Sequence, residues 1–217
     1  MNIIVKKVRL VAPPEPPFVG TRFELEVAED SLVWGFRSAI KSADSDAISV
    51  GWGDGTSNSF LADMSYHLHT FPRAGRYTVF VSDDISGIAF SSNSGEYSEK
   101  YAPMLRTFFS NSAKLTTLRM FPFSDAVNLT DFDIRETQIE TIPVMSFRNC
   151  QSLTRVEFPH VTSVSGQTEA NMPFRGCTSL QEIHFAEANK AALLASPAFQ
   201  FDPEHLGAPL ATVSFDL

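Results

Sequence analysis

Two pairs of side chains in this 217-residue sequence are of types that could bind a metal ion. His67 and His69 alternate along a predicted strand, so both imidazole rings would lie on one face of it. A zinc site needs three or four ligands, and the spacing along the chain indicates no third one. Cys150 and Cys177 also lack the spacing of a metal site, and two cysteines make no disulfide framework. We therefore predict no metal site and no cofactor.

Motifs of catalysis and phosphate binding are absent from the sequence. It contains no Gly-rich phosphate loop, no Gly-x-Ser-x-Gly elbow, no Cys-x-x-Cys and no His-Glu-x-x-His. Asp54 is a single carboxylate in Trp-Gly-Asp-Gly-Thr, whereas a calcium loop of the EF-hand type needs several acidic residues. A turn explains this segment better, with positive φ at Gly53 and Gly55 and with Asp54 hydrogen-bonded to the local backbone. We expect the protein not to be an enzyme.

Acidic side chains outnumber basic ones by 25 to 17, which gives a net charge of −8. Nonspecific nucleic-acid binding needs a basic surface that displaces counterions, so this balance argues against nucleic acid as a partner. The sequence also has nineteen phenylalanines but only four tyrosines and two tryptophans. Because phenylalanine side chains make no hydrogen bonds, the excess favours core packing over a sugar-stacking or interface surface.

Membrane and export signals are not visible in the sequence. No apolar run approaches the roughly 18 residues that span a membrane. Residues 1–12 carry charges inside their apolar stretch, whereas a secretory signal keeps its basic residues ahead of it. We expect an alternating strand there. Either the protein is not exported by this route, or its signal has been removed.

Residues 1–95 show the alternation that is typical of β-strands. Apolar residues recur at every second position in three segments, Phe23-Glu-Leu25-Glu-Val27, Ile48-Ser-Val50-Gly-Trp52 and Tyr77-Thr-Val79-Phe-Val81. Proline- and glycine-rich turn signals separate them at residues 12–17, 53–56 and 72–75. Short strands with frequent turns favour a β-sandwich, with Trp52 in its core. The polar residues 91–100 would then join it to a second unit.

A repeat begins after residue 100. Its two strong copies, 27 residues apart, are Phe147-x-x-Cys150-x-x-Leu153-x-x-Val156-x-Phe158 and Phe174-x-x-Cys177-x-x-Leu180-x-x-Ile183-x-Phe185. Weaker copies begin at Phe109 and Phe123, and the last one keeps only Leu210-x-x-Val213-x-Phe215. Leucine spacings of 14, 24, 27 and 30 residues indicate irregular coils, and we interpret the 14-residue step as a truncated turn.

Each copy predicts one coil of a stack. A coil cannot bury its apolar strand face alone, so neighbouring coils stack and share a core. Cys150 and Cys177 occupy equivalent positions in this stack and are predicted to be buried thiols. The fold class is then mainly β, with an N-terminal β-sandwich over residues 1–95 and a short repeat solenoid of about five irregular coils over residues 101–217.

The exposed face of the repeat strands is the candidate binding surface. In Leu-x-x-Val-x-Phe the residues on either side of the Val position point outward, because side chains alternate along a strand. One predicted column contains Thr117, Asp131, Arg155, Glu182 and Thr212, and the other contains Arg119, Asp133, Glu157, His184 and Ser214. Arg155 should lie between Asp131 and Glu182, since adjacent strands are about 4.8 Å apart.

These columns have two interpretations. They form either a solvated ladder of charges that compensate one another or a polar, acid-leaning surface for a ligand. On the second interpretation, the ligand-binding candidates are Arg119, Asp131, Asp133, Arg155, Glu157, Glu182 and His184.

The repeat resembles the BspA-like (Treponema-type) leucine-rich repeat, whose pattern is F-x-x-C-x-S-L-x-x-I/V-x-F/L-P. The segment Phe147-Arg-Asn-Cys150-Gln-Ser-Leu153-Thr-Arg-Val156-Glu-Phe-Pro159 matches it nearly throughout, and the resemblance covers residues 105–217. The N-terminal half resembles the PKD-like immunoglobulin-type domain in Trp52-Gly-Asp-Gly-Thr56 and His69-Thr-Phe71-Pro-Arg-Ala-Gly75-Arg-Tyr77-Thr-Val79. Tyr77 resembles a tyrosine corner, in which the hydroxyl is tied to an upstream carbonyl.

The resemblance implies a noncatalytic bacterial protein at the cell surface or outside the cell, with no membrane span. Its repeats would serve adhesion or recognition, with a protein or glycan of host or neighbouring cells as the ligand. Such proteins normally begin with an export signal, which this sequence does not show. A structural component of a phage or another assembly would account for that absence. An accessory carbohydrate-binding module would instead place exposed aromatic side chains on a flat sandwich face.

Overall fold

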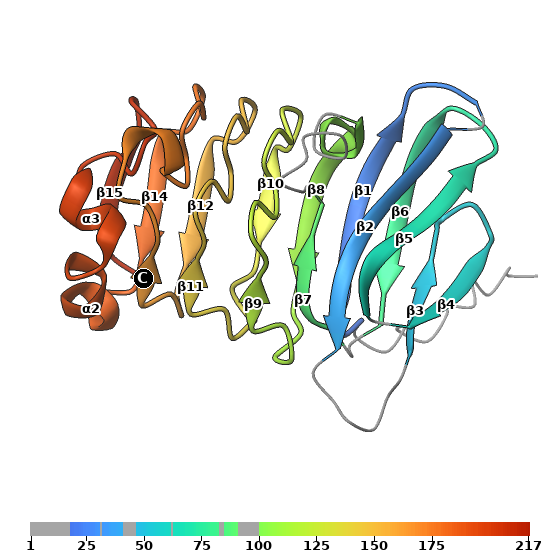
Figure 1. Ribbon diagram of the computed structural model, residues 1–217, viewed down its shortest axis with the longest axis horizontal. Helices are drawn as coiled ribbons and strands as arrows, with labels where there is room; N and C mark the ends of the chain where they lie inside the picture. Colours follow the sequence, from blue (N-terminus) through green and yellow to red (C-terminus); the bar gives the residue numbers. More distant parts are fainter. Residues whose placement is uncertain (1–17, 31, 41–46, 62, 83–84, 91–99) are drawn as a thin grey trace, which may run out of the picture.

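The computed structural model describes residues 18–30, 32–40, 47–61, 63–82, 85–90 and 100–217, and the statements below concern these residues. They are mainly β, as the sequence predicts, and they also contain a few short helices, which the sequence analysis does not predict (Figure 1). The strand predicted within residues 1–12 and most of the junction predicted at residues 91–100 lie outside the described residues.

Seven strands make up the N-terminal half. They are β1 (Thr21–Val27), β2 (Leu32–Ile40), β3 (Ala47–Gly51), β4 (Ser57–Leu61), β5 (Asp63–Phe71), β6 (Gly75–Val81) and β7 (Ile85–Ala89).

The C-terminal half has shorter strands and a few helical turns. Its strands are β8 (Leu105–Ser110), β9 (Thr117–Leu118), β10 (Asp131–Asp133), β11 (Thr141–Ile142), β12 (Arg155–Phe158), β13 (Ser163–Val164), β14 (Glu182–Phe185) and β15 (Thr212–Phe215). Its helices are the 3-10 turns η1 (Ala102–Met104), η2 (Glu169–Asn171) and η3 (Glu187–Asn189), and the α-helices α2 (Lys190–Leu194) and α3 (Pro197–Phe201).

Two sheets pack face to face in the N-terminal half. One sheet has the strand order β10-β8-β1-β6-β3-β4, and the other has the order β5-β2-β7-β9. Side chains alternate along β1, so Phe23 is buried while Arg22 and Glu24 face solvent. The ring of Phe23 meets those of Trp34 and Phe36 on β2, with centroids 5.4 and 5.3 Å apart. Aromatic side chains therefore fill the space between the two sheets.

The turn after β3 has the conformation predicted for it. Gly53 and Gly55 have φ of +79° and +91°, which glycine adopts without a steric penalty. The backbone N–H of Thr56 donates a hydrogen bond to Oδ1 of Asp54 at 2.9 Å. The other carboxylate oxygen of Asp54 lies 2.7 Å from Nε2 of His69. Asp54 thus acts in local structure, as the sequence indicates.

Two aromatic side chains hold the ends of strands in place. The hydroxyl of Tyr77 donates to the carbonyl oxygen of Arg73 at 2.8 Å, which is the upstream tie predicted for it. Trp52 is fully buried, and its Nε1–H donates to Oδ1 of Asn58 at 2.7 Å. Both residues are therefore packing elements.

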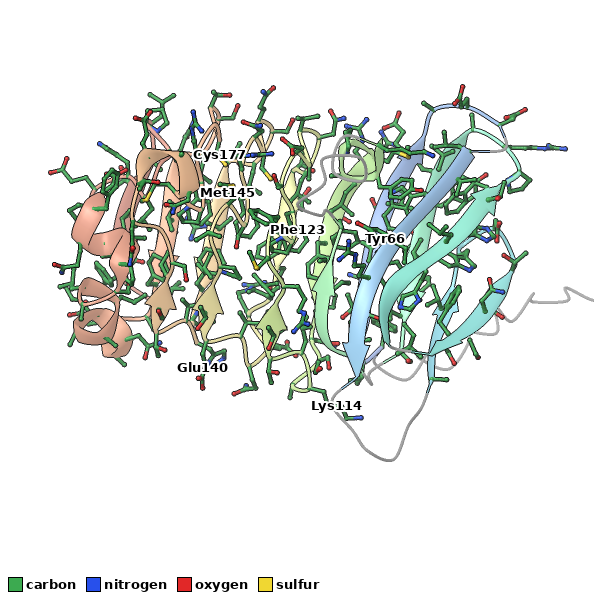
Figure 2. All side chains as sticks on the ribbon, viewed as in Figure 1. Tyr66, Lys114, Phe123, Glu140, Met145 and Cys177 are labelled. Carbon is green, nitrogen blue, oxygen red and sulfur yellow. The ribbon has the colours of Figure 1, made fainter. Side chains whose placement is uncertain are left out.

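Stacked coils follow in the C-terminal half, side by side along the long axis of the molecule (Figure 1). β12, β14 and β15 form a parallel sheet, and β11 pairs in parallel with β13. Phe123, labelled in Figure 2, stacks on Phe147 with ring centroids 5.3 Å apart, and Phe147 stacks on Phe174 at 5.2 Å. These rings are fully buried and form a continuous column through successive coils.

β8 joins the two halves into one core. It pairs antiparallel with β1 and parallel with β10, while β7 pairs in parallel with β9. Phe123 contacts both Phe90 and Phe108, with centroids 5.4 and 4.9 Å apart. The buried apolar side chains of both halves form a single cluster. The bounds proposed for two units, 1–95 and 101–217, stay a prediction, and the hydrophobic core passes from one to the other without a break.

The first coil departs from the predicted repeat. The copy that begins at Phe109 assigns Leu118 to the same kind of strand as Val156. Leu118 instead lies on β9, which pairs with β7, while the strand beside β10 is β8. The 14-residue step from Leu115 to Leu129 is therefore not a truncated turn. It leads from the side of the first coil that carries β9 to the opposite side of the next coil, which carries β10. Apolar residues spaced i, i+3 occur on both sides of a coil, because both sides bury apolar side chains in the core. The spacing alone therefore does not tell which side a repeat copy follows.

Candidate recognition surface

The longer strands of the repeat coils expose one face. Along β12, Val156 and Phe158 are buried, whereas Arg155 and Glu157 point outward. β14 has the same alternation of buried and outward side chains. This follows from the period of two in β-strands combined with a buried inner face.

The parallel register aligns the outward side chains in two columns. The first column contains Arg155, Glu182 and Thr212, and the second contains Glu157, His184 and Ser214. These neighbours are those predicted from the repeat for strands β12, β14 and β15.

Arg155 links the two columns. Its Nη2 donates to Oε1 of Glu157 at 2.8 Å, and its Nη1 pairs with the carboxylate of Glu182 on the next coil. Hydrogen bonds from His184 and Arg155 lower the pKa of Glu182 below its ordinary value. The charges on this face therefore compensate one another, as the first of the two interpretations expects.

The network extends to Arg135, which the sequence columns do not include. Arg135 follows β10, and its Nη2 pairs with Oδ2 of Asp133 at 2.8 Å. Its Nη1 lies 3.7 Å from Oε2 of Glu157. Hydrogen bonds from Arg135 lower the pKa of Asp133 in spite of its partial burial. The spacing Asp133-x-Arg135, with a cation two residues after an outward acid, is a sequence signal that could have revealed the part of Arg135 in this network.

His184 ends the network at the last coil. Its Nδ1 lies 2.7 Å from Oδ1 of Asp216 and 2.7 Å from the hydroxyl of Ser214, and its Nε2 lies 3.2 Å from Oε2 of Glu182. Burial alone lowers the pKa of His184, but the hydrogen bonds with Asp216 and Glu182 outweigh it and raise the pKa above its usual value. Asp216 also lies outside the predicted columns, because it follows the last repeat strand.

Asp131 does not take part in this network. Arg155 was predicted to lie between Asp131 and Glu182, but among the described residues its ion pairs are with Glu157 and Glu182. β10 and β12 lie next to each other but belong to different sheets, so Asp131 and Arg155 are on neighbouring strands that are not paired. A shallow cavity of about 360 Å³ lies there, lined by Asp131, Asp133, Arg135, Arg155, Glu157 and their neighbours.

Comparison with known proteins identifies the repeat. Residues 101–200 match the BspA type leucine-rich repeat region, in six copies. The match covers the two strong copies and the weaker copies that begin at Phe109 and Phe123, whereas the last copy at residues 210–215 lies beyond it. It supports this half of the predicted resemblance. No curated protein and no solved structure matches the chain.

Two residues predicted for the columns lie on the other side of the leucine-rich repeat region. Thr117 is on β9 opposite Gly87, and the backbone N–H of Arg119 donates to the carbonyl oxygen of Ile88. The first column instead continues from Asp131 to Thr107 on β8. The placement of Arg119 in the second column is therefore wrong, because its repeat copy follows the shorter side of the coil.

The two cysteines of the leucine-rich repeat region are buried and free, as predicted. Sγ of Cys150 donates to the carbonyl oxygen of Phe123 at 3.2 Å, and Sγ of Cys177 donates to that of Phe147 at 2.9 Å. Burial raises the pKa of the Cys150 thiol well above its usual value. Both thiols therefore link one coil to the one before it.

The histidines of β5 are held by neighbours within the N-terminal sheets. Nε2 of the buried His67 lies 2.9 Å from the hydroxyl of Ser38, and the ring of His69 stacks on Trp52 with centroids 4.6 Å apart. No group of three His, Cys, Asp or Glu side chains that could hold a metal ion occurs in the described part of the chain. None of the helices described there is long and apolar enough to cross a membrane.

Proposed function

We propose that this protein is a noncatalytic recognition protein that binds a protein or glycan through the outward columns of its repeat coils. The observation that carries the proposal is the in-register alignment of Arg155 with Glu182 and of Glu157 with His184. Buried aromatic rings hold these strands in place, so the polar groups stand at fixed positions that a ligand can match without ordering them first.

The charge network is compatible with ligand binding. Arg155 and Glu182 are each about half exposed at their side chains, so a ligand can reach them. Exposed ion pairs contribute little to stability, roughly 0 to 1 kcal/mol each, and can exchange partners at small cost. A polar ligand could therefore replace these contacts on the surface.

The location of the protein is part of the same proposal. BspA-type leucine-rich repeat regions are commonly associated with surface adhesion, which supports a bacterial cell surface or extracellular location. We further propose that the N-terminal half is a PKD-like domain of the immunoglobulin type. Its two facing sheets, the Asp54 turn and the Tyr77 hydroxyl support that assignment.

Array screening of the full-length protein tests the function. We expect binding to a defined set of glycans or host proteins, and weaker binding by the Arg155→Glu and Glu157→Lys variants. A matched control is Lys190→Glu, which reverses a charge outside the two columns. Unchanged affinity of both column variants for every ligand that is detected would show that the columns are not the binding surface.

A structural role in a phage or another assembly is the second candidate, and an accessory carbohydrate-binding module is the third. The continuous core across β8 is the observation that supports the assembly role, because the two halves share one buried cluster of apolar side chains. Cell fractionation together with the genomic neighbourhood separates the candidates. Purification with intact particles and tail genes nearby would support the assembly role over adhesion.

A further inference from the structure

The rows of outward side chains continue from the repeat strands onto the N-terminal sheet. Eight residues in two rows face outward where the halves meet, and we call them the junction face. The first row runs through Phe80, Arg22, Phe109 and Asp133, and the second through Thr78, Glu24, Thr107 and Asp131, each residue opposite the next on the neighbouring strand.

The first row provides apolar surface. Phe80 is 40% exposed, although it is a large apolar residue, and its ring packs with that of Phe18 in a T-shaped arrangement at a centroid distance of 5.4 Å. The guanidinium of Arg22 lies 4.6 Å from the centroid of the Phe109 ring. The charge of Arg22 is thus held over an aromatic face rather than against a carboxylate.

The second row encloses a hollow between two carboxylates. Glu24 and Asp131 both lie directly opposite Thr107, on its two sides. Their strands are therefore two strand spacings apart, about 10 Å. Two adjoining cavities of about 430 and 590 Å³ are both lined by these three residues, because the threonine side chain is shorter than its neighbours.

These two carboxylates differ from the others on this face. Glu26 pairs with Arg106 at 2.8 Å, Asp133 pairs with Arg135, and Glu182 pairs with Arg155. Glu24 and Asp131 have no ion pair with another described residue, and Asp131 accepts only a hydrogen bond from the hydroxyl of its neighbour Thr130. Three arginines line the same cavities, but Arg76 and Arg106 pair with Glu26 and Arg22 lies over the Phe109 ring. Among the described residues, Glu24 and Asp131 are therefore carboxylates of the hollow without a cationic partner.

We propose that the junction face binds an extended segment of a partner protein that inserts a lysine or arginine side chain between Glu24 and Asp131. Such a side chain has an apolar stem, which can pack beside Phe109 and Phe80, and a cationic head that suits two carboxylates. A neutral sugar would use the aromatic rings but would leave both charges uncompensated. The inference rests on the proposed recognition function and names its partner class.

A peptide array that also carries neutral glycans tests the inference with the full-length protein. We expect the retained peptides to be enriched in lysine or arginine. For the strongest of them, the double variant Glu24→Gln with Asp131→Asn should weaken binding about tenfold, since two charged hydrogen-bond partners are lost. The matched control, Glu140→Gln with Glu169→Gln, removes two exposed carboxylates elsewhere and should bind as the wild type does. Glu140 lies at the lower edge of the coils in Figure 2.

Retained peptides without such enrichment, retention of glycans only, or no retention at all would overturn the inference. Unchanged peptide affinity in the Glu24 and Asp131 variant would do the same. The column variants Arg155→Glu and Glu157→Lys are measured on the same array. If only the column variants lose binding, the proposed function stands and the junction face is not the binding site. If only the Glu24 and Asp131 variant loses binding, the junction face is the binding site and the columns around Arg155 are not.

Discussion

Arg155 on β12 pairs with Glu157 on its own strand and with Glu182 on the neighbouring coil. One guanidinium thus connects two columns and two coils. The same pattern recurs at Arg135, which connects Asp133 with Glu157. The exposed face is therefore a chain of alternating charges, and its positions are set by the strand register beneath it.

The contact between His184 and Asp216 should make stability depend on pH. The folded-state pKa of His184 is raised above 6.5, so its contribution is present below that value and is lost as pH rises through the raised pKa. The pKa of Asp216 is lowered below 3.8, so its contribution is lost as pH falls through the lowered value. We expect Asp216→Asn to be most destabilising between these two limits.

Urea unfolding of wild type and Asp216→Asn at about pH 3, 5 and 8 measures this difference. His184 also faces Glu182 on its own strand and lies opposite Glu157, so His184→Gln serves as the control that removes the titrating group. In that background the effect of Asp216→Asn should no longer change around pH 7. A destabilisation by Asp216→Asn that is equal at all three pH values would contradict the assignment.

Phe147 is the centre of the column of stacked rings. It is fully buried between Phe123 and Phe174, so Phe147→Ala removes contacts on both sides and leaves a cavity. We expect a loss of about 3 to 5 kcal/mol in the free energy of unfolding. Phe201, which is 49% exposed, is the matched control, and Phe201→Ala should change stability by less than about 0.5 kcal/mol. Similar losses in both variants, measured by denaturant titration, would show that the column is not central to the core.

Gly53 and Gly55 lie in the same turn and test the role of close packing. Both have positive φ, so either substitution by alanine costs about 1 kcal/mol in backbone conformation. A Cβ on Gly53 would also collide with the backbone of Thr78, whereas one on Gly55 would meet open space. Gly53→Ala should therefore lower the melting temperature clearly more than Gly55→Ala. Equal shifts for the two variants would mean that the turn moves freely away from β6.

The leucine-rich repeat region should not fold well without the N-terminal sheets. β1 covers the edge of β8, and Phe90 packs on both Phe108 and Phe123. A fragment of residues 101–217 would expose this apolar end, and we expect it to bind a hydrophobic dye and to lose its cooperative unfolding transition. The full chain under the same conditions is the control. A cooperative, dye-free fragment would show that the repeats are stable alone.

The sequence alone predicts the repeat strands well. Fixed spacing assigns Val156 and Ile183 to equivalent inward positions, and side-chain alternation then assigns Arg155, Glu157, Glu182 and His184 to the outside. Both inferences are local, because a period along the chain becomes a register once identical coils stack. Repeat spacing likewise assigns Cys150 and Cys177 to the interior, and the glycines on either side of Asp54 assign that residue to a turn.

Only the tertiary structure decides where the repeat meets the rest of the protein. The pairing of β1 with β8 joins segments about 85 residues apart that share no repeat, so no spacing along the chain reveals it. It decides that Thr107, and not Thr117, continues the column, and that Arg119 lies on the opposite side. It also brings Glu24 and Asp131 to the two sides of one threonine, because strand pairing, unlike repeat spacing, is set by packing between distant parts of the chain.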